Sequence, residues 1–147
     1  RRVHGATLSA VEGGAQSDNH ISVALAAITG VWSDHPLTRQ SFGELREILS
    51  TSRPLTPAAD RSRCALLEVQ AELLERFLER HGDRKGAKEL RSSEAVYLTF
   101  LALCPPWRPG LFLLLGKLSG IEPNLGLKFA AWASRAAGRR LTGKGRG

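Results

Sequence analysis

The residues best placed to do chemistry lie near the C-terminus, where cations and one aromatic side chain recur at helical spacing. Intervals of three and four residues separate Lys128, Trp132, Arg135 and Arg139. On a helix that turns 100° per residue, these side chains fall within about 60° of one another. Cations in such a stripe can pair with phosphates, while the indole stacks on a base or sits at a lipid headgroup. The spacing therefore predicts a surface that binds an anionic partner.

The positive charge continues toward the end of the chain at Arg140, Lys144 and Arg146. From Gly120 onward there are six Lys and Arg residues and a single acidic residue, Glu122. A structural interpretation of the same segment is equally open. In it the tryptophan closes the core, and the cations suit the negative end of a helix dipole.

Two patterns resemble catalytic motifs without completing them. Residues 138–144 fit the G-x-x-x-x-G-K part of a phosphate-binding loop, but Gly145 stands where Ser or Thr must hold magnesium, and no strand precedes the segment. Ser33, Asp34 and His35 are adjacent in sequence, so their side chains diverge instead of converging as a triad requires. We therefore expect neither an enzyme nor a small-molecule substrate.

Metal-binding patterns are absent from the sequence. Cys64 and Cys104 stand alone, and the four histidines are scattered without an i, i+4 pair. Acidic residues do recur along one predicted helix, opposite its leucine stripe, where we expect a solvated face: Glu68, Glu72, Glu75 and Glu79. We expect no metal and no cofactor.

Composition favours a globular domain with an anionic partner. The chain has 147 residues, 42% of them hydrophobic, and a net charge of +7. That length suits one domain with a real core, and the charge favours nucleic acid, an anionic membrane surface or an acidic protein. The chain lacks methionine and opens on Arg1 and Arg2. We expect a processed chain: a cleaved organelle transit peptide, a shortened chain or a viral polyprotein product would each explain it.

The helices that must position the cation–aromatic stripe can be predicted from three signals: the helical spacing of apolar residues, N-cap residue types and prolines. Expected helices cover about 19–32, 41–50, 57–81, 94–103, 109–119 and 123–137. Specific boundary signals are a capping box formed by Ser41 and Glu44, a cap at Thr56 with Pro57 next, and stops at Gly82 and Gly120.

The predicted fold class is all-α: a single irregular bundle of five or six helices. An extended N-terminal arm covers residues 1–18, a helical domain residues 19–137, and a basic flexible tail residues 138–147. The apolar run 95–104 is too short to cross a bilayer.

These observations predict a non-enzymatic structural or accessory subunit of a large assembly. We expect an RNA-contacting subunit of an organelle ribosome or another ribonucleoprotein, located in the mitochondrion or another organelle matrix. Its partners would be other subunits and RNA, with an anionic membrane surface as a further possibility. Two alternatives remain open: a peripheral subunit of a respiratory or photosynthetic membrane complex, and a viral nucleocapsid or matrix-type protein.

Overall fold

The computed structural model describes residues 19–50 and 54–143, and in these two ranges the chain forms six helices and no strand. The first helix covers residues 19–31. The others are α2 (Arg39–Ser50), α3 (Pro57–His81), α4 (Ala87–Leu103), α5 (Gly110–Ile121) and α6 (Leu125–Gly143). The predicted all-α class is confirmed. The predicted N-terminal arm lies outside the described residues.

The longest helix, α3, is the centre of the fold. Thr56 caps it as predicted, because its hydroxyl accepts a bond from the amide of Ala59 at 3.3 Å, and Pro57 follows at the first helical position. α3 packs against α2, α4 and α5. The core between them is aliphatic, and its most deeply buried members include Leu67, Leu98, Leu114 and Leu118.

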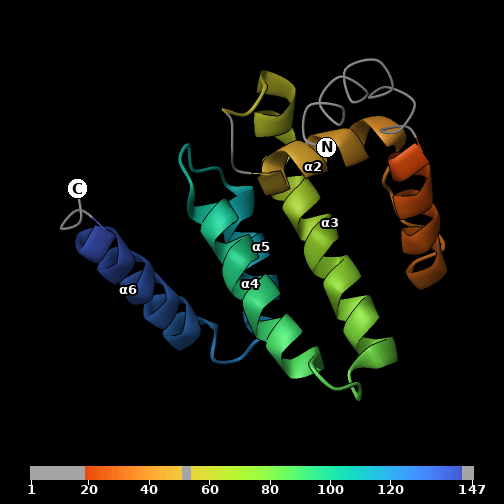
Figure 1. The fold of residues 1–147 in the computed structure, drawn as a ribbon. Helices are drawn as coiled ribbons and strands as arrows, with labels where there is room; N and C mark the ends of the chain where they lie inside the picture. The colour runs from red at the N-terminus through yellow and green to blue at the C-terminus, as the bar shows by residue number, and fades with distance from the viewer. Residues whose placement is uncertain (1–18, 51–53, 144–147) are drawn as a thin grey trace, which may run out of the picture.

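The helices form a layered arrangement in which α3 and α4 stand side by side (Figure 1). α5 lies behind α4 and packs on both α3 and α4. α2 crosses one end of α3, and the first helix lies along the side of α3 away from α4. Arg76 of α3 stacks 4.7 Å from the Trp32 ring centroid, and Arg80 donates to the carbonyl of Gly30, so two cations attach the first helix to α3.

The starts of α2 and α4 differ from the sequence prediction. The amide of Ser41 donates to the hydroxyl of Thr38 at 3.1 Å, and the amide of Thr38 donates to the Ser41 hydroxyl at 2.8 Å. Thr38 is therefore the cap, and Ser41 occupies the third helical position. The predicted loop 82–91 ends early, because Gly86 turns the chain with φ +88° and α4 begins at Ala87.

The predicted end of α3 at His81, just before Gly82, is confirmed, although Gly82 has a right-handed backbone with φ −63°. The predicted stop at Gly120 was wrong, because α5 runs through Gly120 to Ile121. α6 continues to Gly143, past the end predicted near Ala137 and into the segment predicted as a flexible tail. One glycine in a helix costs only about 1 kcal/mol relative to alanine, which the neighbouring helix formers can offset.

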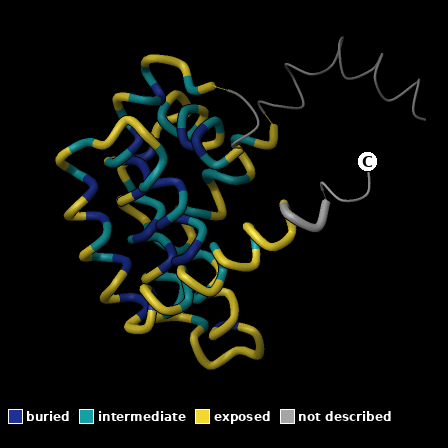
Figure 2. Tube along the Cα trace, turned by 90° about the vertical axis from the view of Figure 1, so that its left-hand side faces the viewer, coloured by how far each residue is buried: buried dark blue, intermediate teal, exposed yellow. Residues whose placement is uncertain are grey.

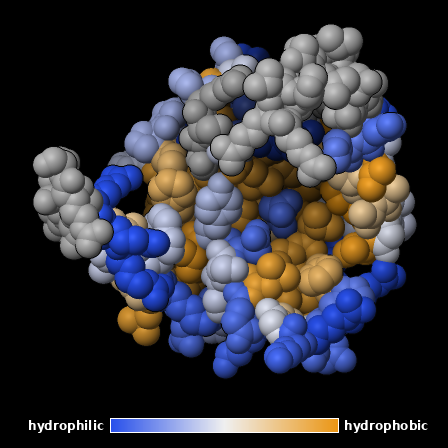
Figure 3. Space-filling model, viewed as in Figure 1, coloured by the Kyte–Doolittle hydropathy of each residue, from blue (hydrophilic) through white to orange (hydrophobic). Residues whose placement is uncertain are grey.

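α6 differs from the other helices in leaving the body of the protein. Figure 2 shows its later turns exposed and extending away from the packed helices. Leu125 at its start is buried, and within the described side chains of α6 no later residue is. Figure 3 shows hydrophilic side chains gathered on α6, whereas apolar side chains dominate the central surface around α3 and α4.

Candidate functional site

A groove between α4 and α6 brings three of the predicted site residues together. Lys128, Trp132 and Arg135 line it from α6, and the opposite wall includes Lys88 and Tyr97 of α4. The groove has a volume of about 890 Å³ and is open to solvent. The predicted cation–aromatic stripe therefore faces a concave surface, at least over its first two turns.

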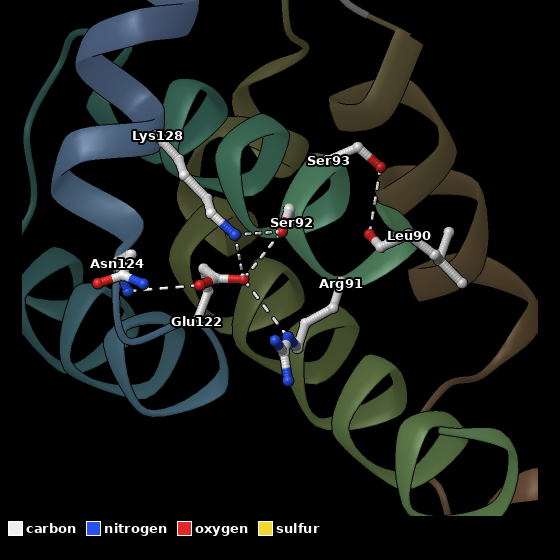
Figure 4. Close-up of polar contacts among 7 residues, drawn as sticks. All are labelled: Leu90, Arg91, Ser92, Ser93, Glu122, Asn124 and Lys128. Atoms are coloured by element: carbon white, nitrogen blue, oxygen red, sulfur yellow. Dashed lines mark hydrogen bonds and ion pairs between the residues drawn. The ribbon is translucent and has the colours of Figure 1, made fainter. Parts of the chain in front are cut away.

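Two residues that line the groove, Lys128 and Ser92, contact a buried carboxylate, Glu122, whose side chain is 1% exposed (Figure 4). The ammonium of Lys128 lies 3.1 Å from Glu122 Oε2 and donates to the Ser92 hydroxyl at 2.7 Å. Ser92 in turn donates to the same carboxylate oxygen at 2.9 Å. Arg91 of α4 makes a longer ion pair with that oxygen, at 3.4 Å. These contacts join the start of α6 to α4.

The environment of Glu122 keeps it ionised. Burial by itself raises the pKa of the Glu122 carboxyl, but the hydrogen bonds from Ser92, Lys128 and the Asn124 amide outweigh burial, and the net pKa is lowered. The charge of Lys128 is thereby balanced inside the protein. Lys128 holds α6 in place, and less of its charge is available to an outside anion.

Trp132 belongs to the packing of α6. Its ring lies 5.2 Å from the ring of Phe100 on α4 and 5.7 Å from that of Phe129, centroid to centroid. It is half-buried and packs against the hydrophobic core. Two rings already pack beside the indole, so the packing of α6 on α4 accounts for Trp132 without an outside partner.

The remaining cations of α6 are exposed. Arg135, which lines the groove, and Arg139 and Arg140 in the turn that follows are all exposed. Lys144 and Arg146, the last two predicted contact residues, lie outside the described residues.

The groove itself is close to electrically balanced. Its cations Lys88, Lys128 and Arg135 are accompanied by Glu89 and Glu94 on the α4 wall, and Lys128 is also paired with Glu122. The groove is therefore not a strongly positive surface, and the exposed arginines of α6 are the better candidates for contact with an anion.

Glu122 and Ser92 are site residues that sequence reasoning missed. Ser92 lies just before the helix expected over 94–103, where serine is typical of a helix cap, but it is inside α4 and donates to Glu122, which is 30 residues away. A signal did exist, because Glu122 is the only acidic residue after Gly120 in a segment with six cations. A lone carboxylate among cations is a candidate for a paired, buried position.

The other sequence patterns have structural roles. The Leu37 amide donates to Nδ1 of His35 at 3.2 Å, and Nε2 lies 2.9 Å from the Thr29 hydroxyl, so His35 stabilises the turn after the first helix. The predicted acidic row on α3 is solvated except at Glu72, which receives bonds from Arg76 and from Lys117 of α5. Over residues 19–50 and 54–143, no three His, Cys, Asp or Glu side chains gather as metal ligands would.

Comparisons with protein families, with curated proteins and with solved structures find no match to this chain. Across the part of the chain that the structure describes, no helix combines the length and apolar character needed to cross a membrane.

Proposed function

We propose that this protein is a non-enzymatic RNA-binding subunit of a larger ribonucleoprotein, and that the outer part of α6 is its contact helix. One observation carries the proposal: a helix that leaves the packed body holds exposed Arg135, Arg139 and Arg140, in a segment without an acidic residue after Glu122. An organelle ribosome remains the example that the sequence favours.

The chemistry of these side chains suits phosphates. Arginine presents a planar fork of donors that matches phosphate oxygens, and it stays charged at all physiological pH values. Arg135 and Arg139 are four residues apart, so they lie on one side of α6 one turn from each other. Arg139 and Arg140 are not part of the groove that α6 forms with α4, so phosphates can approach these two side chains without meeting α4.

The base of α6 supports this role by fixing the direction of the helix. Glu122, Lys128 and Ser92 hold the first turn on α4, and Trp132 packs one turn later. Contact residues held on a rigid helix lose less entropy on binding than the same residues in a loop. In this proposal Lys128 and Trp132 position the helix, and the three arginines make the contacts.

The test is a salt titration of RNA binding by the purified chain. The wild type should bind RNA with a log affinity that falls steeply as the salt concentration rises, by about 0.7 to 0.9 log units per log unit of salt for each phosphate contact. The double variant Arg135→Ala with Arg139→Ala should bind more weakly and with a slope shallower by about 1.4 to 1.8.

A matched control removes two exposed cations elsewhere. Arg84 and Lys85 lie in the loop between α3 and α4, and their double alanine variant has the same net charge as the α6 variant. It should keep the wild-type slope. Equal losses in the two variants would mean that net charge, and not α6, governs binding. Binding to vesicles of anionic lipid but not to RNA would assign α6 to a membrane surface.

A further inference from the structure

Two charged residues of the described ranges are buried, and they differ in their partners. Arg63 of α3 is 2% exposed and Glu122 is 1% exposed. Glu122 faces two cations, Lys128 and Arg91. Arg63 makes no ion pair anywhere in residues 19–50 and 54–143. Because buried charges are ordinarily paired, Arg63 stands out as an uncompensated cation in the interior.

Backbone carbonyls satisfy only part of the Arg63 side chain. Its Nη1 and Nη2 donate to the carbonyls of Pro105 and Pro106, just after α4. Its Nε is buried and bonds to no acceptor. The Nε atoms of Arg91 and Arg108 also lack a hydrogen bond, but these side chains are more than one-third exposed, and each pairs with a carboxylate. The two carbonyls hold the turn after α4 on α3 without neutralising the charge of Arg63.

Arg63 lines a pocket between α2, α3 and the end of α4. The pocket has a volume of about 270 Å³, and Arg63 is the one charged side chain among the described residues that line it. No residue of α6 takes part, so what this pocket binds is independent of RNA binding by α6. Apart from Arg63, its walls include Ile48, Leu55, Phe100, Leu101 and Cys104.

We propose that this pocket binds a small organic acid, with one carboxylate on an apolar body. The carboxylate would balance the guanidinium and offer acceptors to its unpaired donor, since arginine pairs with carboxylates in a planar fork. The apolar body would lie against Ile48, Leu55 and Phe100. The volume is below the roughly 300 to 1,000 Å³ of pockets for drug-sized ligands, so the acid must be small. A single cation among apolar walls favours a monoanion over a phosphate or a dicarboxylate.

Calorimetric titration of the full chain with hexanoate tests the proposal near neutral pH. The wild type should bind hexanoate saturably, with a Kd on the order of 1 mM for so small a ligand. Acetate lacks the apolar body and 1-hexanol lacks the charge, so each should bind weaker by roughly tenfold or more. A wild type without saturable hexanoate binding, or one that binds 1-hexanol as tightly, overturns the proposal.

Two variants test the role of Arg63. Arg63→Met should weaken hexanoate binding by roughly tenfold or more. Arg61→Met is the matched control, because Arg61 is exposed on the same helix and the charge change is identical. Equal losses in the two variants overturn the proposal. Cys104→Phe fills the pocket and keeps Arg63, so it should also abolish binding, and it decides the matter if Arg63→Met does not fold. Unchanged binding by Cys104→Phe overturns the pocket as the site.

Alkylation of the two cysteines tests the place of binding without a variant. Both thiols are half-buried, but Cys104 lines the pocket, whereas Cys64 lies beside Gly110 of α5. Saturating hexanoate should slow the reaction of Cys104 with iodoacetamide and leave that of Cys64 unchanged, as mass spectrometry of the two peptides can measure. Hexanoate that binds without protecting Cys104, or that protects both thiols equally, overturns the pocket as its site.

Discussion

α5 and α6 follow each other in the chain, yet they meet solvent with opposite chemistry. α5 buries Leu111, Leu114 and Leu118 on one side and shows an uncharged, apolar face on the other. Among the side chains of α6 whose burial is described, Leu125 alone is buried, and exposed arginines follow along the helix. Glu122, between the two helices, joins the start of α6 to α4.

The difference shows how one basic chain can have an uncharged apolar surface on one helix and a cationic surface on the next. Cations near α5 are each bonded to a carboxylate of α3, so their charge is balanced inside the protein. On α6, Lys128 is balanced in the same way by Glu122. Net charge alone therefore does not locate an anion-binding surface. Charges that are paired inside the protein must first be subtracted from the net charge, because they do not attract an outside anion.

The largest expected change in the free energy of unfolding is for a substitution on the buried side of α5, compared with one on its exposed side. Leu114→Ala should lower the free energy of unfolding by about 3 kcal/mol, because Leu114 is fully buried and its removal leaves a cavity. Phe112→Ala should change it by less than about 0.5 kcal/mol. Urea denaturation of both variants measures this. A large loss for Phe112→Ala would mean that the exposed side of α5 is part of the chain's own core.

The next effect concerns the attachment of α6. Glu122→Gln should lower the free energy of unfolding by about 2 kcal/mol near neutral pH, because Lys128 and Arg91 lose their shared carboxylate. Both cations are about one-third exposed, so water offsets part of the loss. Glu89→Gln is the control on α4, since Glu89 is exposed, and it should change little. Similar losses in the two variants would contradict the anchoring role.

The same carboxylate predicts a pH dependence. The folded pKa of Glu122 lies below its ordinary value of 4.5, so its stabilisation is present above that pH and is lost as the pH falls through the folded pKa. The stability gap between wild type and Glu122→Gln should therefore close in acid. Denaturation midpoints measured from about pH 7 down to about pH 3 check this. A gap that stays constant would mean that the carboxylate's charge is not what stabilises α6.

A smaller change in the free energy of unfolding should distinguish the start of α6 from its exposed later turns. Lys128→Met should lower the free energy of unfolding by about 1 kcal/mol, since it leaves Glu122 buried with one fewer donor. Arg135→Met removes a charge from the exposed part of α6 and should be neutral within about 0.5 kcal/mol. Thermal unfolding of the pair tests this difference. Equal effects would mean that α6 is anchored along its whole length.

The sequence predicted those helix boundaries that depend on the conformational preferences of neighbouring residues. Thr56 with Pro57 marked the start of α3, and Pro105 with Pro106 marked the break between α4 and α5, because proline restricts the backbone whatever the tertiary context. Glycines were poorer guides. Gly120 and Gly138 lie inside helices, since a single glycine only weakens a helix.

What the sequence did not predict depends on contacts between distant residues. The bond between Ser92 and Glu122 spans 30 residues, and nothing near Ser92 distinguishes it from a helix cap. Likewise, the packing of Trp132 on Phe100 depends on how α6 crosses α4. The helical spacing placed Lys128, Trp132 and Arg135 on one side, but only the fold shows that Lys128 already has a partner.

The most direct test measures the salt dependence of RNA affinity for one variant of each helix. The double variant Arg135→Ala with Arg139→Ala should lose RNA affinity, because it removes two exposed cations of α6. Phe112→Glu changes the exposed side of α5 and should keep the wild-type salt slope. An α6 variant that bound RNA as the wild type does, or an equal loss in the two variants, would contradict the division of roles between α5 and α6.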